Sequence, residues 1–166
     1  SLGAPAGHRI AWQEAGAQAT MIDKGRVLVV EDDPAIRAGI SHQLRRAGYL
    51  PFVAATVAEA RVRLRNTAVD LILLDLGLPD GSGLDLLNDL RQDDAEHARI
   101  PVVVLTGRDP AEVKAPSLRG GAQVFLRKPA REAAILDAVA KLMGASERTP
   151  DNLYDWQRSQ RRGQSW

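Results

Sequence analysis

The sequence predicts an α/β domain with a parallel sheet, and two patterns between residues 25 and 144 support this. Short apolar runs alternate with amphipathic segments, which is typical of repeated βα units. The apolar runs are also nearly continuous, as expected for strands covered by helices on both faces. We expect residues 1–24 to be an extension that is flexible or in part of artificial origin, residues 25–144 to be the domain, and residues 145–166 to be a polar tail.

The strands are expected at the short apolar runs, each separated from the next by an amphipathic segment. The expected strands are Arg26–Val30, Pro51–Ala55, Asp70–Leu74, Pro101–Leu105 and Gln123–Leu126.

The first helix is expected to begin at Pro34 and to end at Gly48, because proline suits the first helical position and glycine a helix end. Its Ile36, Ile40 and Leu44 recur every four residues and give it one apolar face.

The second helix is expected to begin after Thr56, which has capping-box spacing to Glu59. We expect it to bury Val57, Ala60 and Leu64.

Three more helices are expected, and the first of them follows a dense loop signal after Asp75. We expect one at about Leu84–Asp93 and one that begins at Asp109 and Pro110, with Glu112 as its box partner. Pro116 lies inside the latter, where it removes a hydrogen bond and clashes with the preceding turn, so we expect that helix to be kinked, short or displaced. The final helix is expected at about Ala130–Met143, with Ile135, Leu136, Val139 and Leu142 inward.

The composition is that of an ordinary globular domain: 45% hydrophobic and 26% charged residues, with a net charge of +1. This charge gives no general attraction to nucleic acid or membrane. The absence of cysteine excludes disulfides and thiolate metal sites and fits a reducing cytoplasm. No apolar stretch approaches the roughly 18 residues that span a bilayer, and no signal-peptide pattern opens the chain. We therefore expect a cytoplasmic protein with no membrane contact.

Polar side chains follow four of the expected strands. Because the carboxyl ends of parallel strands meet at one edge of a sheet, we expect these side chains to converge. They are Glu31 and Asp32, Asp75, Thr106 and Lys128.

The converging residues have the chemistry of a cation and phosphoryl site. Three carboxylates repel each other unless a cation neutralises them, and Mg²⁺ (or Mn²⁺) prefers such oxygen ligands. Lys128 and Thr106 offer a positive charge and a hydroxyl to phosphoryl oxygens, which leaves Asp75 as the nucleophile. Each residue alone also has an ordinary structural reading: the acidic pair as a helix cap, Asp75 as a turn former, Lys128 as a surface lysine and Thr106 as a turn cap. The joint pattern is more specific than any member.

Four segments carry a resemblance to a known family. Val-Leu-Val-Val-Glu-Asp-Asp-Pro, Leu-Ile-Leu-Leu-Asp-Leu-Gly-Leu-Pro-Asp-Gly-Ser-Gly, Val-Val-Val-Leu-Thr-Gly-Arg and Phe-Leu-Arg-Lys-Pro resemble the receiver domains of bacterial two-component response regulators, the CheY-like superfamily. The resemblance covers about residues 25–144. It implies a flavodoxin-like (βα)₅ fold with strand order 2-1-3-4-5 and phosphotransfer to an aspartate from the phosphohistidine of a sensor kinase or phosphotransfer protein.

The resemblance also implies a role for each matching residue. Asp75 matches the phospho-acceptor, and Lys128 matches the phosphate-binding lysine, with a cis bond expected before Pro129. Thr106 and Phe125 match the switch pair that alters the surface formed by the fourth helix, the fifth strand and the fifth helix. The Mg²⁺ ligands implied are Glu31, Asp32, Asp75 and the backbone carbonyl of Gly77. Such a domain catalyses its own phosphorylation and dephosphorylation but is not a conventional turnover enzyme.

Some positions depart from the family pattern and leave the mode of output open. Pro116 lies on the surface that the family uses for output. Gln123 and Val124 stand where OmpR-type regulators usually carry two aspartates, which weakens the case for their salt-bridged dimer. Ala130 replaces a common phenylalanine, and Phe125 lacks the hydroxyl of a tyrosine.

The segments outside the domain add little chemistry. A short helix is possible at Trp12–Ala19. The tail, with Tyr154, Trp156, Trp166, Arg158, Arg161 and Arg162, is read either as a linker or as a docking segment on a neighbouring chain. Direct DNA binding is not expected from a few arginines. We expect a downstream protein partner or an output domain not in this chain, and a homodimer is possible.

Other functions remain as alternatives. The chain is a stand-alone receiver, or a receiver from a hybrid kinase or transcription regulator, or a receiver-like binding module that does not depend on phosphorylation. A phosphatase would need a dedicated general acid, and a flavodoxin would need a phosphate loop without the acidic Glu31–Asp33. For the phosphoryl lifetime, we hypothesise that Gly77 leaves space for water whereas Arg108 partly covers the phosphoryl group.

Overall fold

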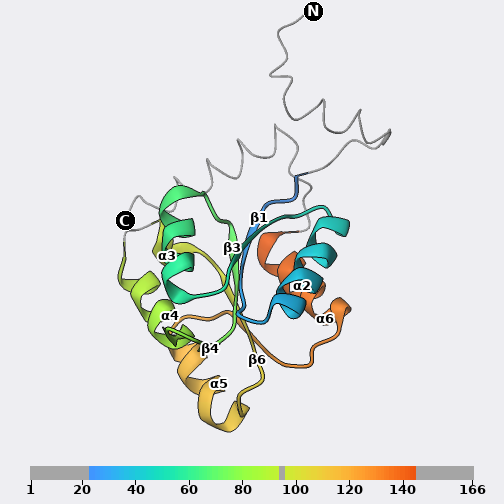
Figure 1. The fold of residues 1–166 in the computed structure, drawn as a ribbon. Helices are drawn as coiled ribbons and strands as arrows, with labels where there is room; N and C mark the ends of the chain where they lie inside the picture. Colours follow the sequence, from blue (N-terminus) through green and yellow to red (C-terminus); the bar gives the residue numbers. More distant parts are fainter. Residues whose placement is uncertain (1–22, 94–95, 145–166) are drawn as a thin grey trace, which may run out of the picture.

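The computed structural model describes residues 23–93 and 96–144. Figure 1 shows one central sheet with helices packed against both of its faces. The possible helix at Trp12–Ala19, the N-terminal extension and the C-terminal tail lie outside the described residues.

The central sheet has five strands, all parallel, in the order β2-β1-β3-β6-β7. Counted within this sheet, the order is 2-1-3-4-5, so the predicted flavodoxin-like fold is confirmed. Each expected strand agrees with an observed one to within one residue. The five strands are β1 (Arg26–Val30), β2 (Leu50–Ala54), β3 (Leu71–Leu74), β6 (Val102–Thr106) and β7 (Val124–Arg127). A small antiparallel hairpin, β4 (Gly77–Leu78) and β5 (Gly81–Ser82), lies in the loop after β3.

The helices form two layers. Helices α2 and α6 cover one face of the sheet, and α3, α4 and α5 cover the other (Figure 1). The helical segments are α2 (Pro34–Arg46), α3 (Val57–Asn66), α4 (Gly83–Gln92), the 3-10 turn η1 (His97–Arg99), α5 (Pro110–Arg119) and α6 (Glu132–Met143). None of the described helices is long and apolar enough to cross a lipid bilayer.

Alternate residues of the central strands pack into two separate hydrophobic cores, one on each face of the sheet. In β1, Val27 and Val29 pack under α2 and α6, whereas Leu28 and Val30 pack under the other three helices. All four are at most 1% exposed, which explains why these strands appear as continuous apolar runs.

Helix α2 begins as predicted but ends earlier. The carboxylate of Asp33 accepts hydrogen bonds from the amides of Ala35 (2.8 Å) and Ile36 (3.1 Å), so the residue before Pro34 is the cap. The helix ends at Arg46, two residues before Gly48.

Helix α3 is capped from two directions. Thr56 accepts from the amide of Glu59 (3.0 Å), as the capping-box spacing predicts. The first two amides of the helix, those of Val57 (2.8 Å) and Ala58 (3.0 Å), instead donate to the carboxylate of Asp80, in the β4–β5 turn. Asp80 thus joins the loop after β3 to the start of α3.

Helix α5 continues through Pro116 to Arg119 and is ten residues long, as are α3 and α4. The expectation that Pro116 shortens this helix is wrong. Val113 (2% exposed) and Ser117 (fully buried) face inward on either side of the proline, and the hydroxyl of Ser117 donates to the carbonyl oxygen of Val113 (2.6 Å). Helix α6 begins at Glu132, two residues later than expected.

Candidate functional site

The polar residues predicted at the strand ends lie at one edge of the sheet. Three of them are fixed by a backbone hydrogen bond to the neighbouring strand. The amide of Glu31 donates to the carbonyl oxygen of Ala54 (3.0 Å) and that of Asp75 to the carbonyl oxygen of Val30 (3.0 Å). The amide of Lys128 donates to the carbonyl of Thr106 (2.8 Å). The sheet therefore sets the positions from which these side chains extend.

Lys128 joins two of the carboxylates. Its Nζ donates to Oε2 of Glu31 in a short contact and to Oδ2 of Asp75 at 3.0 Å. Glu31 and Asp75 are only 3% and 7% exposed, and the Lys128 side chain is 17% exposed. The peptide bond between Lys128 and Pro129 is cis, as the resemblance implied.

Asp32 completes an acidic cluster with Glu31 and Asp75. One carboxylate oxygen from each lies within 4.8 Å of the others, and Asp32 is the exposed member. Three carboxylates and one ammonium leave two net negative charges at the edge. The donor set is all oxygen, matches a divalent cation in charge and keeps one side open to solvent, so it fits a hard cation such as Mg²⁺.

Burial and pairing act in opposite directions on the ionisable groups. Burial raises the pKa of Glu31, and this effect outweighs the hydrogen bonds from Lys128 and from the amide of Asp33. For Lys128, burial lowers the pKa, but the hydrogen bonds and charges of Glu31 and Asp75 outweigh it, so the pKa is raised. The ammonium group of Lys128 thus provides the positive charge beside the carboxylates of Glu31 and Asp75 in this structure.

The loop after β3 approaches the backbone of Asp75 closely. The amide of Gly77 donates to Oδ1 of Asp75 (3.2 Å). A Cβ on Gly77 would meet nothing within 4 Å, whereas one on Gly83 would lie 2.5 Å from the carbonyl oxygen of Asp75 and 2.8 Å from Cα of Leu76. Glycine is required by packing at 83 and not at 77.

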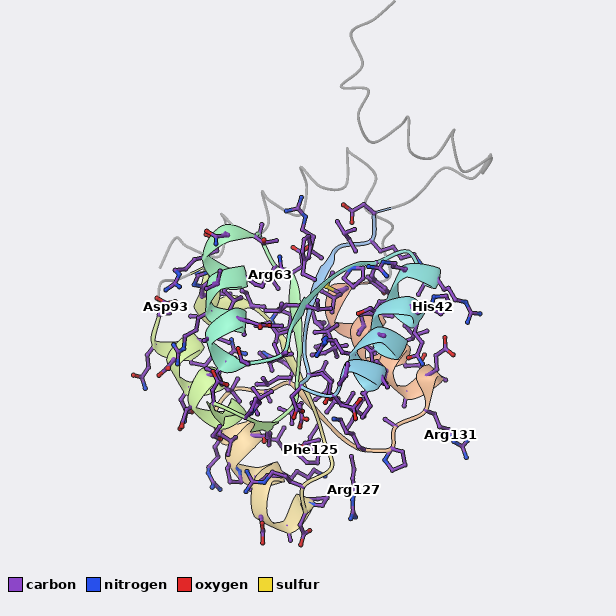
Figure 2. The ribbon with its side chains drawn as sticks, in the orientation of Figure 1. His42, Arg63, Asp93, Phe125, Arg127 and Arg131 are labelled. Carbon is purple, nitrogen blue, oxygen red and sulfur yellow. The ribbon has the colours of Figure 1, made fainter. Side chains whose placement is uncertain are left out.

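The two residues matched to the switch lie on neighbouring strands. Thr106 is fully buried at the end of β6, and its Oγ1 accepts a hydrogen bond from the amide of Arg108 (3.3 Å). Phe125 on β7 is half-buried and packs against the core under α3, α4 and α5. Figure 2 shows Phe125 and Arg127 at the end of the sheet where β7 leads to α6.

Two further residues contact the site, and no sequence pattern predicted the role of either. Arg37, in the first turns of α2, donates from Nη1 to the carbonyl oxygens of Glu31 (2.9 Å) and Asp32 (3.3 Å). Gly83 allows the close approach to Asp75. The dense glycine signal of the loop is the one feature that could have pointed to Gly83, whereas nothing in the sequence marks Arg37.

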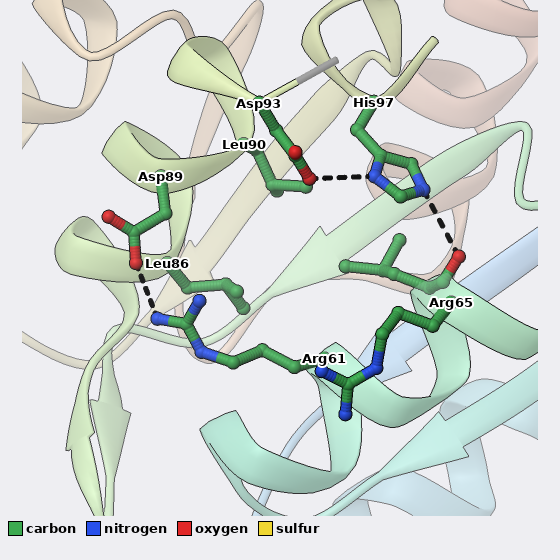
Figure 3. A pocket seen from close by; sticks show the side chains of 8 residues that line it. Arg61, Arg65, Leu86, Asp89, Leu90, Asp93 and His97 are labelled. Atoms are coloured by element: carbon green, nitrogen blue, oxygen red, sulfur yellow. Dashed lines mark hydrogen bonds and ion pairs between the residues drawn. The ribbon is translucent and has the colours of Figure 1, made fainter.

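A separate pocket of about 320 Å³ lies between α3, α4 and η1 (Figure 3). Arg61 and Asp89 form an ion pair across it, and His97 links Oδ2 of Asp93 (2.8 Å) to the carbonyl of Leu64 (3.1 Å). No residue of the acidic cluster lines it, and its polar groups hold the two helices together.

Comparisons with known proteins agree with this arrangement. The family model described as "Response regulator receiver domain" matches residues 27–140. The KDP operon transcriptional regulatory protein KdpE of Escherichia coli is 41% identical over 103 residues, which cover 62% of this chain and 44% of that protein. The chain spans about half the length of the curated relatives it matches.

Solved receiver domains have the same fold. The receiver domain of a histidine kinase from Syntrophus aciditrophicus is 32% identical, with a TM-score of 0.66 over 75% of this chain and 94% of that one. That of sensor histidine kinase PA1611 from Pseudomonas aeruginosa, which holds a magnesium ion in its active-site cleft, is 26% identical, with a TM-score of 0.66 over 72% and 98% of the chains. This chain belongs to the response regulator receiver domain family.

Proposed function

We propose that Asp75 accepts a phosphoryl group from the phosphohistidine of a sensor kinase or phosphotransfer protein. The observation that carries this proposal is the contact of Lys128 with both Asp75 and Glu31 inside the acidic cluster. The arrangement pairs a nucleophilic carboxylate with a cation that can stabilise the transferred group. We propose residues 25–144 as the complete receiver and the cytoplasm as its location.

The cation site would be formed by Glu31, Asp32, Asp75 and the backbone carbonyl of Gly77. Mg²⁺ or Mn²⁺ bound there would offset the negative charge that an incoming phosphoryl group adds to three carboxylates. The relative from Pseudomonas aeruginosa, whose active-site cleft coordinates magnesium, supports this assignment.

In the proposed reaction, a carboxylate oxygen of Asp75 attacks the phosphorus atom of the phosphohistidine. The new O–P bond forms as the P–N bond to the imidazole breaks, and the imidazole leaves with the bonding electron pair. Lys128 neutralises charge on the phosphoryl oxygens, and the hydroxyl of Thr106 donates to one of them. Withdrawal of this hydroxyl toward the phosphoryl group would let Phe125 move further inward and alter the surface of α5, β7 and α6.

The partners follow from the relatives. KdpE and TorR of Escherichia coli are named as transcriptional regulatory proteins, and the matched part is about half of each. We propose that this receiver acts on an output domain or a separate protein partner, and that its own residues do not bind DNA.

The test is the intact mass of the protein after incubation with acetyl phosphate and Mg²⁺. We expect one phosphoryl group on the wild type, none on Asp75→Ala, and none on the wild type when EDTA replaces Mg²⁺. Asp85→Ala, at an exposed site on α4, is the matched control and should be modified like the wild type. If the wild type is modified neither by acetyl phosphate nor by a phosphorylated histidine kinase, the proposal fails and a binding module independent of phosphorylation replaces it.

A further inference from the structure

The backbone of the acidic pair is held by a cation outside the cluster. Nη1 of Arg37 donates to the carbonyl oxygens of Glu31 (2.9 Å) and Asp32 (3.3 Å), and the arginine itself is half-buried. A guanidinium offers several donors in a fixed plane, so one side chain can hold two successive carbonyl groups.

Among the described residues, no other donor forms a hydrogen bond to these two carbonyl groups. The amide of Glu31 is bound to β2, Oε1 of Glu31 accepts from the amide of Asp33 (3.1 Å), and Asp33 in turn caps α2. The carbonyl groups of Glu31 and Asp32 are therefore oriented by Arg37.

The orientation of these peptide groups matters because three carboxylates repel one another. The direction of a Cα–Cβ bond follows from the peptide planes on either side of it, so fixing the carbonyl groups limits how far the carboxylates of Glu31 and Asp32 can turn away. Arg37, itself a cation, cannot ligate a metal, and it acts here through the backbone of the residues that can.

We propose that Arg37 is a positioning residue for the cation site: it holds the acidic pair in the arrangement that a divalent cation binds. This inference rests on the proposed function of the cluster. Its role resembles that of the outer partners of metal ligands, whose loss commonly weakens metal binding by about 10- to 100-fold.

The experiment measures Mn²⁺ binding by electron paramagnetic resonance of the free ion, with the full chain. Arg37→Met keeps the aliphatic stem and removes the donors, and Arg45→Met is the matched control on an exposed site of the same helix. We expect Arg37→Met to bind Mn²⁺ about tenfold more weakly than the wild type, and Arg45→Met to bind like the wild type. Circular dichroism establishes that each variant is folded at the assay temperature.

The sign of the change separates positioning from charge. Removing the positive charge of Arg37 would by itself strengthen Mn²⁺ binding, because that charge repels the ion, whereas a loss of positioning weakens binding. In the metal-free protein, hydrogen exchange of the Asp33 amide, which donates to Glu31, should be faster in Arg37→Met than in Arg45→Met.

The outcomes are distinct. Equal Mn²⁺ affinity of the folded Arg37→Met and Arg45→Met proteins would overturn the role of Arg37, as would tighter binding by Arg37→Met. If the wild type binds no Mn²⁺, the cation site of the proposed function itself fails.

Discussion

Nζ of Lys128 lies 3.0 Å from Oδ2 of Asp75, although 53 residues separate the two in the sequence. The same nitrogen contacts Glu31, so one ammonium group is shared by two buried carboxylates and balances one of their two negative charges. Charge balance at this edge therefore depends on Lys128 whenever no other cation is bound.

Replacing Lys128 by Met should destabilise the metal-free protein by about 3 kcal/mol, because two buried carboxylates lose their partner. Added Mg²⁺ should restore more stability to this variant than to the wild type, since the ion supplies the missing charge. Urea unfolding in EDTA and in Mg²⁺ measures both effects. Lys141→Met, at an exposed site of α6, should change neither value. Equal stabilisation of the wild type and Lys128→Met by Mg²⁺ would contradict the prediction.

Gly83→Ala should cost about 1–3 kcal/mol of unfolding free energy, because the new methyl group would overlap the backbone of Asp75 and Leu76. The displaced backbone is that of Asp75, the proposed phospho-acceptor, so phosphorylation by acetyl phosphate should also slow. Gly107→Ala, where a Cβ meets nothing within 4 Å, is the control and should leave the phosphorylation rate unchanged. Chemical denaturation and timed mass spectrometry check the two effects, and a Gly83→Ala protein as stable as Gly107→Ala would refute the steric argument.

Asp80 should make folding sensitive to acid. The amides of Val57 and Ala58 hold its pKa below the ordinary value of 3.8, so its stabilising effect is present above pH 3.8 and is lost as the pH falls through the lower, folded-state pKa. Asp80→Asn should therefore lower stability at neutral pH and flatten the acid decline. The measurement is the unfolding free energy between about pH 2 and pH 5, a range that brackets carboxyl titration. Asp137→Asn, on the exposed face of α6, is the control. Identical pH profiles for the two variants would show that the Asp80 cap does not contribute to the pH dependence of stability.

Arg108 should lengthen the life of the phosphorylated state. Its amide donates to Oγ1 of Thr106, which places Arg108 in the loop beside the site. If the guanidinium partly covers the phosphoryl group while Gly77 leaves room for water, Arg108→Ala should lose phosphate several-fold faster. The decay of the phosphorylated protein after removal of the donor is the measurement, with Arg119→Ala on α5 as control. An unchanged decay rate would show that Arg108 does not protect the phosphoryl group.

The sequence predicts the fold and the convergence of the polar side chains well, because both depend on regular patterns. Apolar runs of strand length identify the sheet, and the parallel arrangement brings the residues after β1, β3, β6 and β7 together. The same patterns predict that Glu31, Asp75 and Lys128 converge, and the structure confirms it through the contacts of the lysine with both carboxylates.

The features that the sequence does not predict depend on how irregular segments pass one another. Asp80 caps a helix that begins 23 residues earlier, and Gly83 matters because the first residue of α4 lies against the backbone of Asp75. Neither distance follows from periodicity. Pro116 shows the reverse case: its local preference predicts a short helix, but α5 continues through the proline, with Val113 and Ser117 buried on either side of it.

The contact between Lys128 and Glu31 spans 97 residues of sequence, and Asp75 lies between them in the chain. During synthesis, Asp75 and the acidic pair emerge well before the lysine that contacts them. A chain that has not yet added β7 to the sheet lacks this balancing charge. The ability to accept a phosphoryl group should therefore appear only after β7 has joined the sheet, so that an incomplete chain is not phosphorylated.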